Sequence, residues 1–128
     1  MAHDAQDDAR GRLSALEDGP VAERGAARRL EEDVALLGRL LTAAAGHRRH
    51  DGPPADVTVD DIGAGLSLFE DMRVALDRLE TQVVIEARRR SMDWRQIARH
   101  QGLNSSQAAS QRYQRLMTRL EEIRQGVR

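Results

Sequence analysis

A run of serine and glutamine residues near the C-terminal end carries the side chains best suited to reading a ligand. At about 100° per residue on a helix, five of them fall in one sector: Ser106, Gln107, Ser110, Gln111 and Gln114. Glutamine amides pair bidentately with adenine edges, and serine hydroxyls both donate and accept hydrogen bonds. A face that is only solvated would more often carry Glu and Lys. We therefore predict that these five residues read base edges in duplex DNA.

Basic side chains accompany this polar sector at positions suited to phosphate contact. Arg95 and Arg99 project one turn apart from the segment just before it. The residues that we expect to contact DNA phosphates are Arg95, Arg99, Ser105, Arg112 and Arg115. A further arginine run at 88–90 is explained equally well by phosphate contact or by the negative end of the helix that it terminates.

Capping signals place these side chains on two short helices joined by a tight turn. Asp93 can cap a first helix that starts at Trp94, and Gly102 can adopt the left-handed conformation that closes it. Ser105 is a suitable N-cap for a second helix. We expect Trp94 to be a packing anchor against Tyr113 rather than a platform for bases. The arrangement is a helix-turn-helix, which commonly places its second helix in the major groove but also occurs as a packing unit without DNA.

The same region carries a longer set of motif positions. They are Ala87-Arg88, Trp94, Ile97-Ala98, Gly102-Leu103, Ser105, Gln107-Ala108-Ala109, Arg112-Tyr113 and Arg115-Leu116. Because of these matching positions, residues 60–120 resemble small bacterial helix-turn-helix regulators, which are sometimes described as heat-shock-gene transcriptional regulators. Two positions depart from that pattern: Gln101 replaces an apolar residue, and Ser106 stands where Arg is common. The second departure removes a phosphate or guanine contact, so it affects sequence preference rather than the fold.

The chain divides into five segments, and the predicted fold class is all-α. Residues 1–19 are acidic without sustained periodicity and predict a mobile tail, whereas 20–45 show the spacing of an amphipathic helix. Residues 46–57 contain two Gly and two Pro and predict a loop. A long helix over 58–90 and the helix-turn-helix over 91–128 follow. We thus expect an N-terminal amphipathic helix pair and a C-terminal helix-turn-helix with an extended recognition helix.

The long helix carries its own start signal and an apolar stripe. Thr58 and Asp61 match a capping box. Its stripe has seven-residue steps at Ile62, Phe69, Leu76 and Val83. Gly63 and Gly65 weaken the first turns but would let another helix approach closely. Two amphipathic helices joined by such a loop predict an antiparallel pair, although the same stripes could form a dimer seam.

Charge is divided unevenly along the 128 residues, although the whole chain has a net charge of only −1. From residue 80 onward ten arginines meet five acids, a net of +5, whereas residues 1–79 have a net of −6. All 20 basic residues are Arg, so arginine abundance alone is weak support for nucleic-acid binding. The second half can approach phosphates, and the first half would repel them.

Several classes of function find no support in the sequence. There is no cysteine, and His47 and His50 lack the neighbours of a metal site, so we expect no metal and no cofactor. No nucleophile turn, phosphate loop or paired-His motif occurs, so we do not expect an enzyme. No apolar run is long enough to cross a bilayer, and we expect a cytoplasmic protein of the nucleoid without a membrane partner.

Two classes of function remain. The first is a transcriptional regulator that binds double-stranded DNA, or a nucleoid-associated protein with weak sequence preference. The second is an interaction adaptor, such as a sigma-factor partner, whose N-terminal helices bind protein. We expect a homodimer, because the apolar stripe of the last helix continues through Leu116, Leu120 and Ile123. The competing arrangement folds this helix back onto its own long helix, giving a monomer.

Overall fold

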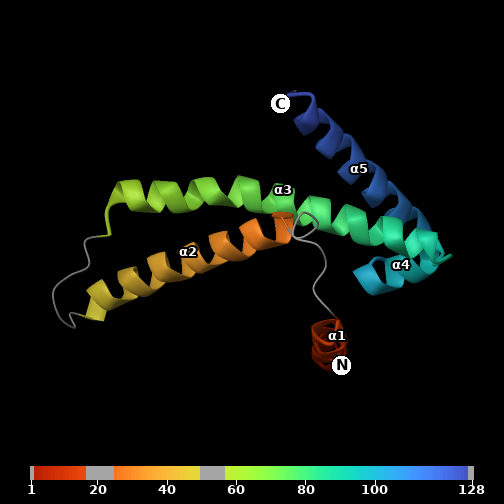
Figure 1. The fold of residues 1–128 in the computed structure, drawn as a ribbon, viewed down its shortest axis with the longest axis horizontal. Coiled ribbons are helices and arrows are strands. Elements are labelled where there is room, and N and C mark those ends of the chain that lie inside the picture. Colours follow the sequence, from red (N-terminus) through yellow and green to blue (C-terminus); the bar gives the residue numbers. More distant parts are fainter. Residues whose placement is uncertain (1, 17–24, 50–56, 127–128) are drawn as a thin grey trace.

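The computed structural model describes residues 2–16, 25–49 and 57–126, and its regular structure there is entirely helical. The helices are α1 (Ala2–Ser14), α2 (Gly25–Arg49), α3 (Val59–Arg89), α4 (Trp94–Gln101) and α5 (Ser106–Arg124). Packing joins α2 to α3, α3 to α5 and α4 to α5. Figure 1 shows α2 and α3 as a long antiparallel pair, with α4 and α5 at the far end of α3. The predicted fold class is therefore confirmed.

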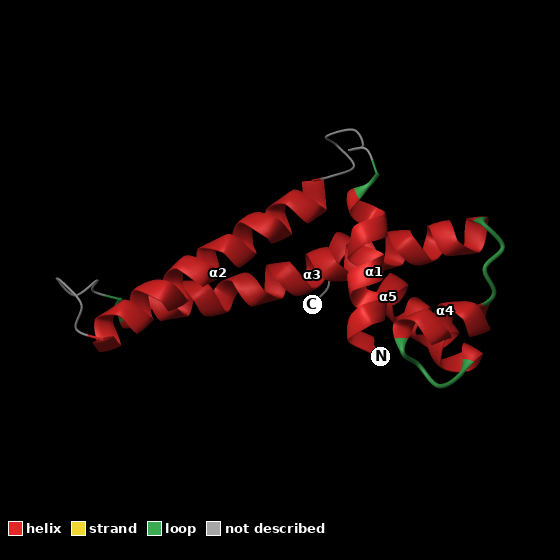
Figure 2. Ribbon diagram, turned by 90° about the horizontal axis from the view of Figure 1, so that it is seen from below, coloured by secondary structure: helices red, strands yellow, loops and turns green. Residues whose placement is uncertain are grey.

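The α2–α3 hairpin is an intrachain pair, and a glycine brings its two helices together. Gly65 of α3 is buried, and a Cβ built on it would lie 2.7 Å from Leu40 Cδ2 and 3.4 Å from Leu37 Cδ2. The close helix approach predicted at this glycine is thus confirmed, whereas Gly63 has no neighbour within 4 Å of such a Cβ. In Figure 2, the view from below, the two helices cross at an angle: they overlap near the C-terminal end of α2 and separate toward its N-terminal end.

Both ends of α3 are fixed by local hydrogen bonds. Thr58 and Asp61 form the predicted capping box, with Asp61 N donating to Thr58 Oγ1 at 3.1 Å and Thr58 N donating to Asp61 Oδ2 at 3.0 Å. At the other end Met92 N donates to Ala87 O at 3.0 Å. Ser91 takes the left-handed conformation there, with φ 64°. This turn, in which Ser91 occupies the place where glycine is usual, redirects the chain from α3 into α4.

The turn between α4 and α5 is closed in the same way. Gly102 has φ 74°, and Leu103 N donates to Ala98 O at 2.8 Å. Asp93 caps α4, and Ser105 caps α5 by accepting a hydrogen bond from Ala108 N at 3.1 Å. The predicted start and stop signals of the helix-turn-helix are therefore confirmed.

A small core holds the helix-turn-helix against the end of α3. Its buried members are Val84, Ile97, Ala98 and Ala109. Trp94 and Tyr113 pack around them with ring centroids 5.7 Å apart and planes tilted by 43°. The predicted packing of Trp94 on Tyr113 is confirmed. The indole therefore packs within the chain, between α4 and α5.

Two segment boundaries differ from the sequence-based expectation. α1 forms where we predicted a mobile tail. A helix needs residues of good helix propensity, such as Ala, Arg and Leu, whereas the apolar periodicity on which we relied indicates only which helix faces are buried. Every α1 side chain described is exposed, and Arg10 pairs with Asp7 at 2.9 Å. α2 continues to Arg49 instead of ending at residue 45, because one glycine at position 46 costs only about 1 kcal/mol in a helix. The rest of the predicted loop up to residue 56, with His50, lies outside the described residues, as does the predicted helix start at residue 20.

Candidate nucleic-acid interface

The outward face of α5 presents the predicted base-reading side chains. Gln107, Gln111 and Gln114 are exposed, on the side of α5 opposite the buried Ala109 and Leu116. Ser106 is exposed at the first turn, and Ser110 is half-buried at the edge of this face. The surface is rich in amide donors and acceptors and has no carboxylate before Glu121.

The polar face extends one turn further than the sequence pattern indicated. Thr118 and Arg115 line a shallow groove together with Gln111 and Gln114, and Arg119 and Glu122 complete its lining. Arg115 is exposed and makes no ion pair with any residue that the structure describes. Thr118 was not predicted, although its position four residues after Gln114 on the same helix would have been sufficient to include it.

Arginines from α4 and the first residues of α5 surround one hollow at the helix-turn-helix turn. It is lined by Arg95, Ala98, Arg99, Leu103, Asn104, Ser105 and Ser106. Arg95 and Arg99 are exposed there, and neither forms an ion pair within the described part of the chain. The N-terminus of α5 adds backbone N–H groups and the positive end of its dipole. Ser105 Oγ accepts the capping bond, so its O–H proton is left to donate. The hollow is thus built to receive an anion, and Asn104 is a member that sequence reasoning missed.

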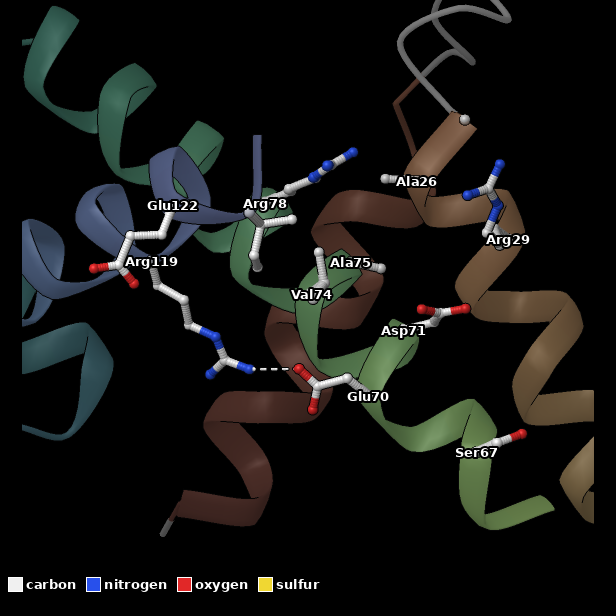
Figure 3. Close-up of a pocket in the computed structure, with 12 residues that line it drawn as sticks. Ala26, Arg29, Ser67, Glu70, Asp71, Val74, Ala75, Arg78, Arg119 and Glu122 are labelled. Carbon is white, nitrogen blue, oxygen red and sulfur yellow. Dashed lines mark hydrogen bonds and ion pairs between the residues drawn. The ribbon is translucent and has the colours of Figure 1, made fainter. Parts of the chain in front are cut away.

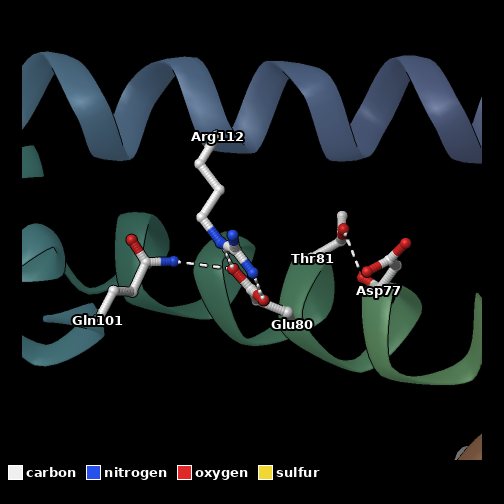
Figure 4. Close-up of polar contacts among 5 residues, drawn as sticks. All are labelled: Asp77, Glu80, Thr81, Gln101 and Arg112. Atoms are coloured by element: carbon white, nitrogen blue, oxygen red, sulfur yellow. Dashed lines mark hydrogen bonds and ion pairs between the residues drawn. The ribbon is translucent and has the colours of Figure 1, made fainter. Parts of the chain in front are cut away.

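Arg112 is placed differently from the other predicted phosphate ligands. It is half-buried, and its guanidinium points toward α3, where Nε and Nη2 donate to the two carboxylate oxygens of Glu80 at 2.5 and 2.7 Å (Figure 4). Gln101 Nε2 donates to the same carboxylate at 3.0 Å. This hydrogen bond explains why Gln101 occupies a position at which the similar helix-turn-helix regulators have an apolar residue.

The Glu80 cluster perturbs the ionisation of both partners. Hydrogen bonding from Arg112 lowers the pKa of Glu80 below its ordinary value, with partial burial opposing the shift and Gln101 adding to it. The pKa of Arg112 is raised by the same bond. A bidentate pair of this kind is geometrically specific, so it fixes the register of α5 on α3.

A second arginine of α5 reinforces this ionic seam with α3. Arg119 Nη2 lies 3.2 Å from Glu70 Oε1, and Arg119 Nη1 lies 3.5 Å from Asp77 Oδ2. Figure 3 shows Arg119 reaching Glu70 across a hollow between α5, the middle of α3 and the start of α2. Glu70, Asp71 and Glu122 also line this hollow. Arg29 and Arg78 line it as well as Arg119, so positive and negative side chains balance there, whereas the hollow at the α4–α5 turn is lined by arginines and no carboxylate.

The arginine run at 88–90 is engaged by its own chain. Arg88 donates to Met92 O at 3.1 Å, and its guanidinium carbon lies 5.0 Å from the centre of the Trp94 ring. Arg89 and Arg90 both pair with Glu86 and thereby lower the pKa of that carboxyl, Arg90 more strongly. The structure therefore gives this run a role in the α3–α4 junction. The exposed arginines nearest the glutamines of α5 are Arg95 and Arg99 of α4 and Arg115 of α5.

Comparison with known proteins is consistent with this geometry. Residues 83–122 match a family model described as a Myb-like DNA-binding domain. The matched range covers the end of α3, all of α4 and nearly all of α5, and it includes the hollow at the α4–α5 turn and the glutamines on the outer face of α5. No curated protein and no solved structure matches the chain. None of the described helices is long and apolar enough to cross a membrane. Fold, site and family similarity together indicate a helical DNA-binding domain in this part of the chain.

Proposed function

We propose that this protein is a transcriptional regulator that binds duplex DNA with α5 in the major groove. The single observation that carries the proposal is the hollow at the α4–α5 turn. There two exposed arginines meet the N-terminus of the helix whose outer face bears the glutamines. Phosphate contacts at such a turn fix the orientation of the recognition helix, and side chains on its outer face then reach base edges.

The predicted contacts divide into three roles. Phosphates are held by Arg95, Arg99, Ser105 and Arg115, whereas Arg112 holds α5 on α3 through Glu80. The base-reading residues are Ser106, Gln107, Ser110, Gln111 and Gln114. Arg112 contributes to DNA binding only through the position of α5, because its guanidinium is bonded to Glu80.

The charge distribution and the resemblance support a cellular setting and an oligomeric state for the proposed regulator. The net charge of +5 from residue 80 onward directs this half of the protein toward DNA. The likeness of residues 60–120 to bacterial helix-turn-helix regulators supports a bacterial regulator in the cytoplasm, at the nucleoid. We also propose that it acts as a homodimer, because one module makes few contacts and a two-fold pair reads two half-sites.

Backbone amide mapping by NMR tests this proposal on the full-length protein. On adding a random duplex, the amides of Arg95, Arg99 and Gln107 should shift, while those of Leu36 and its neighbours on α2 stay in place. A folded protein whose α4 and α5 amides do not respond to duplex DNA at low salt would contradict the proposal. That result would favour the adaptor function, with the helix-turn-helix as a scaffold.

A further inference from the structure

One face of the α2–α3 hairpin leaves large apolar side chains in solvent. Its members, which we call the hairpin face, are Val34, Leu41, Ile62, Leu66, Phe69 and Leu76. Leu41 and Leu66 are each 67% exposed, and Val34 is 53% exposed. A contiguous apolar surface of this kind marks an interaction site in soluble proteins.

The six residues lie on one side of the line along which α2 and α3 touch. Leu37 and Gly65 mark that line. On one side of it, Leu36 of α2 and Ala64 of α3 line a shared groove. At about 100° per residue, the residues of the hairpin face lie on the other side of the contact line from this groove, and they do so on both helices. The two helices therefore contribute to one continuous surface.

The spacing along this surface is regular on both helices. Val34 and Leu41 are seven residues apart, as are Ile62 and Phe69. Counting in opposite directions from the contact at Gly65 places Leu41 level with Ile62, and Val34 level with Phe69. Seven-residue apolar steps at matched levels are the pattern of a seam between packed helices.

The apolar stripe of α5 is already used within the chain. Leu116 is buried, and Leu120 and Ile123 are half-buried. α5 packs on α3, so this stripe, from which we predicted a dimer, is covered by its own chain. The hairpin face is the comparable stripe that is still exposed among the described residues.

We propose that the hairpin face binds the same face of a second copy of this chain, forming a four-helix bundle. This inference rests on the homodimer part of the proposed function and does not depend on DNA binding. α2 has 25 residues, so the hairpin is about 37 Å long and about 20 Å wide. The resulting area of roughly 700 Å² per copy is close to the ~800 Å² that each partner buries in a stable interface.

Charge at the edges of the hairpin face fits a second copy and selects its orientation. Glu31 of α2 and Arg73 of α3 lie at about the same level, on the two outer edges of the hairpin face. Neither forms an ion pair with a described residue, and Arg73 is held 5.7 Å from the centre of the Phe69 ring. A two-fold axis parallel to the helices brings Arg73 of one copy beside Glu31 of the other. The isologous bundle thus pairs opposite charges twice.

Sedimentation equilibrium of the full chain, with matched variants, tests the interface. Wild type should have twice the chain mass at micromolar concentration. Leu41→Glu and Leu66→Glu should raise the dimer dissociation constant by at least about 30-fold, the scale of an interface hot spot. Both residues are exposed in the single chain, so helical circular dichroism should be unchanged. Leu36→Glu, which places the same charge on the opposite side of α2, should leave the dimer intact.

Charge reversal then tests the orientation. Arg73→Glu should weaken the dimer, and Arg73→Glu combined with Glu31→Arg should restore it. A monomeric wild type would overturn the proposal, because the hairpin face would then be covered by another segment or another protein. A dimer that survives both Leu41→Glu and Leu66→Glu, or variants that lose their helices, would also overturn it. Binding of random duplex measured in parallel separates the two proposals, since a dimer that binds no DNA would retain the interface and reject the regulator.

Discussion

At the scale of single residues, the proposed readout depends on exposed amide side chains of α5 that make no hydrogen bond to the described part of the chain. Gln107→Ala should reduce discrimination at one base pair by about 1–3 kcal/mol while leaving affinity for random duplex nearly unchanged. Competition binding with a selected site and a random site measures both quantities. Gln82→Ala, an exposed glutamine on α3, is the matched control. Equal losses on both duplexes would place Gln107 outside the readout.

The Glu80 carboxylate gives a prediction for pH. Its pKa in the folded protein lies below its ordinary value of 4.5, chiefly because Arg112 donates to it. Its contribution to stability is therefore complete above about pH 4.5, and it is lost as the pH falls through the lower folded value. Glu80→Gln should lower the free energy of unfolding at pH 7 by about 1 kcal/mol, a modest figure because Arg112 is partly exposed.

Urea unfolding of wild type and Glu80→Gln across the acid range checks this prediction. The difference in stability should shrink as the pH falls below about 4.5, because the Glu80 carboxyl of the unfolded wild-type chain is protonated there and that of the folded protein only at lower pH. A difference that stays constant to pH 3 would show that the pair contributes through packing alone.

The exposure of the proposed reading residues on one side of α5 could be predicted from the sequence, whereas the pairing of Arg112 with Glu80 could not. Helical phase alone put Gln107, Gln111 and Gln114 on one side of α5. The same phase put Arg112 at the edge of that side, where a phosphate and a carboxylate are equally good partners. Glu80 lies 32 residues away in the chain, and only the packing of α5 on α3 brings the two together. The sequence alone therefore could not show that Glu80, rather than a phosphate, is the partner of Arg112.

At the scale of the elements, two glycines near the start of α3 have opposite roles. Gly63 has open space around it, so Gly63→Ala should stabilise the protein by about 1 kcal/mol through helix propensity. Gly65→Ala should gain less or destabilise, because its Cβ would meet Leu40 Cδ2 at 2.7 Å and the side chain must move. Thermal unfolding of the two variants checks the contrast. Equal stabilisation by both would mean that α2 does not approach α3 as closely as described.

Element boundaries could be predicted where a specific hydrogen bond defines them. The capping box at Thr58, the cap at Ser105 and the left-handed Gly102 each belong to a few neighbouring residues, and each was found from local sequence. α1 and the last turn of α2 have no such signal. Their formation depends on summed helix propensity, which a search for apolar periodicity does not register.

At the scale of the whole molecule, the two ends of α3 serve different purposes. α5 packs along the C-terminal half of α3, where Val84 also joins the small core with α4, and the N-terminal half of α3 pairs with α2 and carries the hairpin face. The sequence showed apolar stripes on all three long helices but not which would be buried within the chain. That choice depends on how α5 returns along α3, and arginine–carboxylate pairs far apart in sequence fix this path. In the proposed dimer, one end of each long helix holds two copies together and the other presents a recognition helix.

The salt dependence of DNA affinity tests the central claim most directly. Anisotropy titrations of the wild-type protein with a labelled duplex should give a logarithmic plot of affinity against salt that falls steeply, because each phosphate contact releases counterions. Arg95→Ala combined with Arg99→Ala should make the slope shallower by about 2 per chain, since each contact contributes about 0.9. Arg39→Ala, which removes an exposed charge from α2, should leave the slope unchanged. A double variant with the wild-type slope, or a folded wild type that binds no duplex at low salt, would contradict the account.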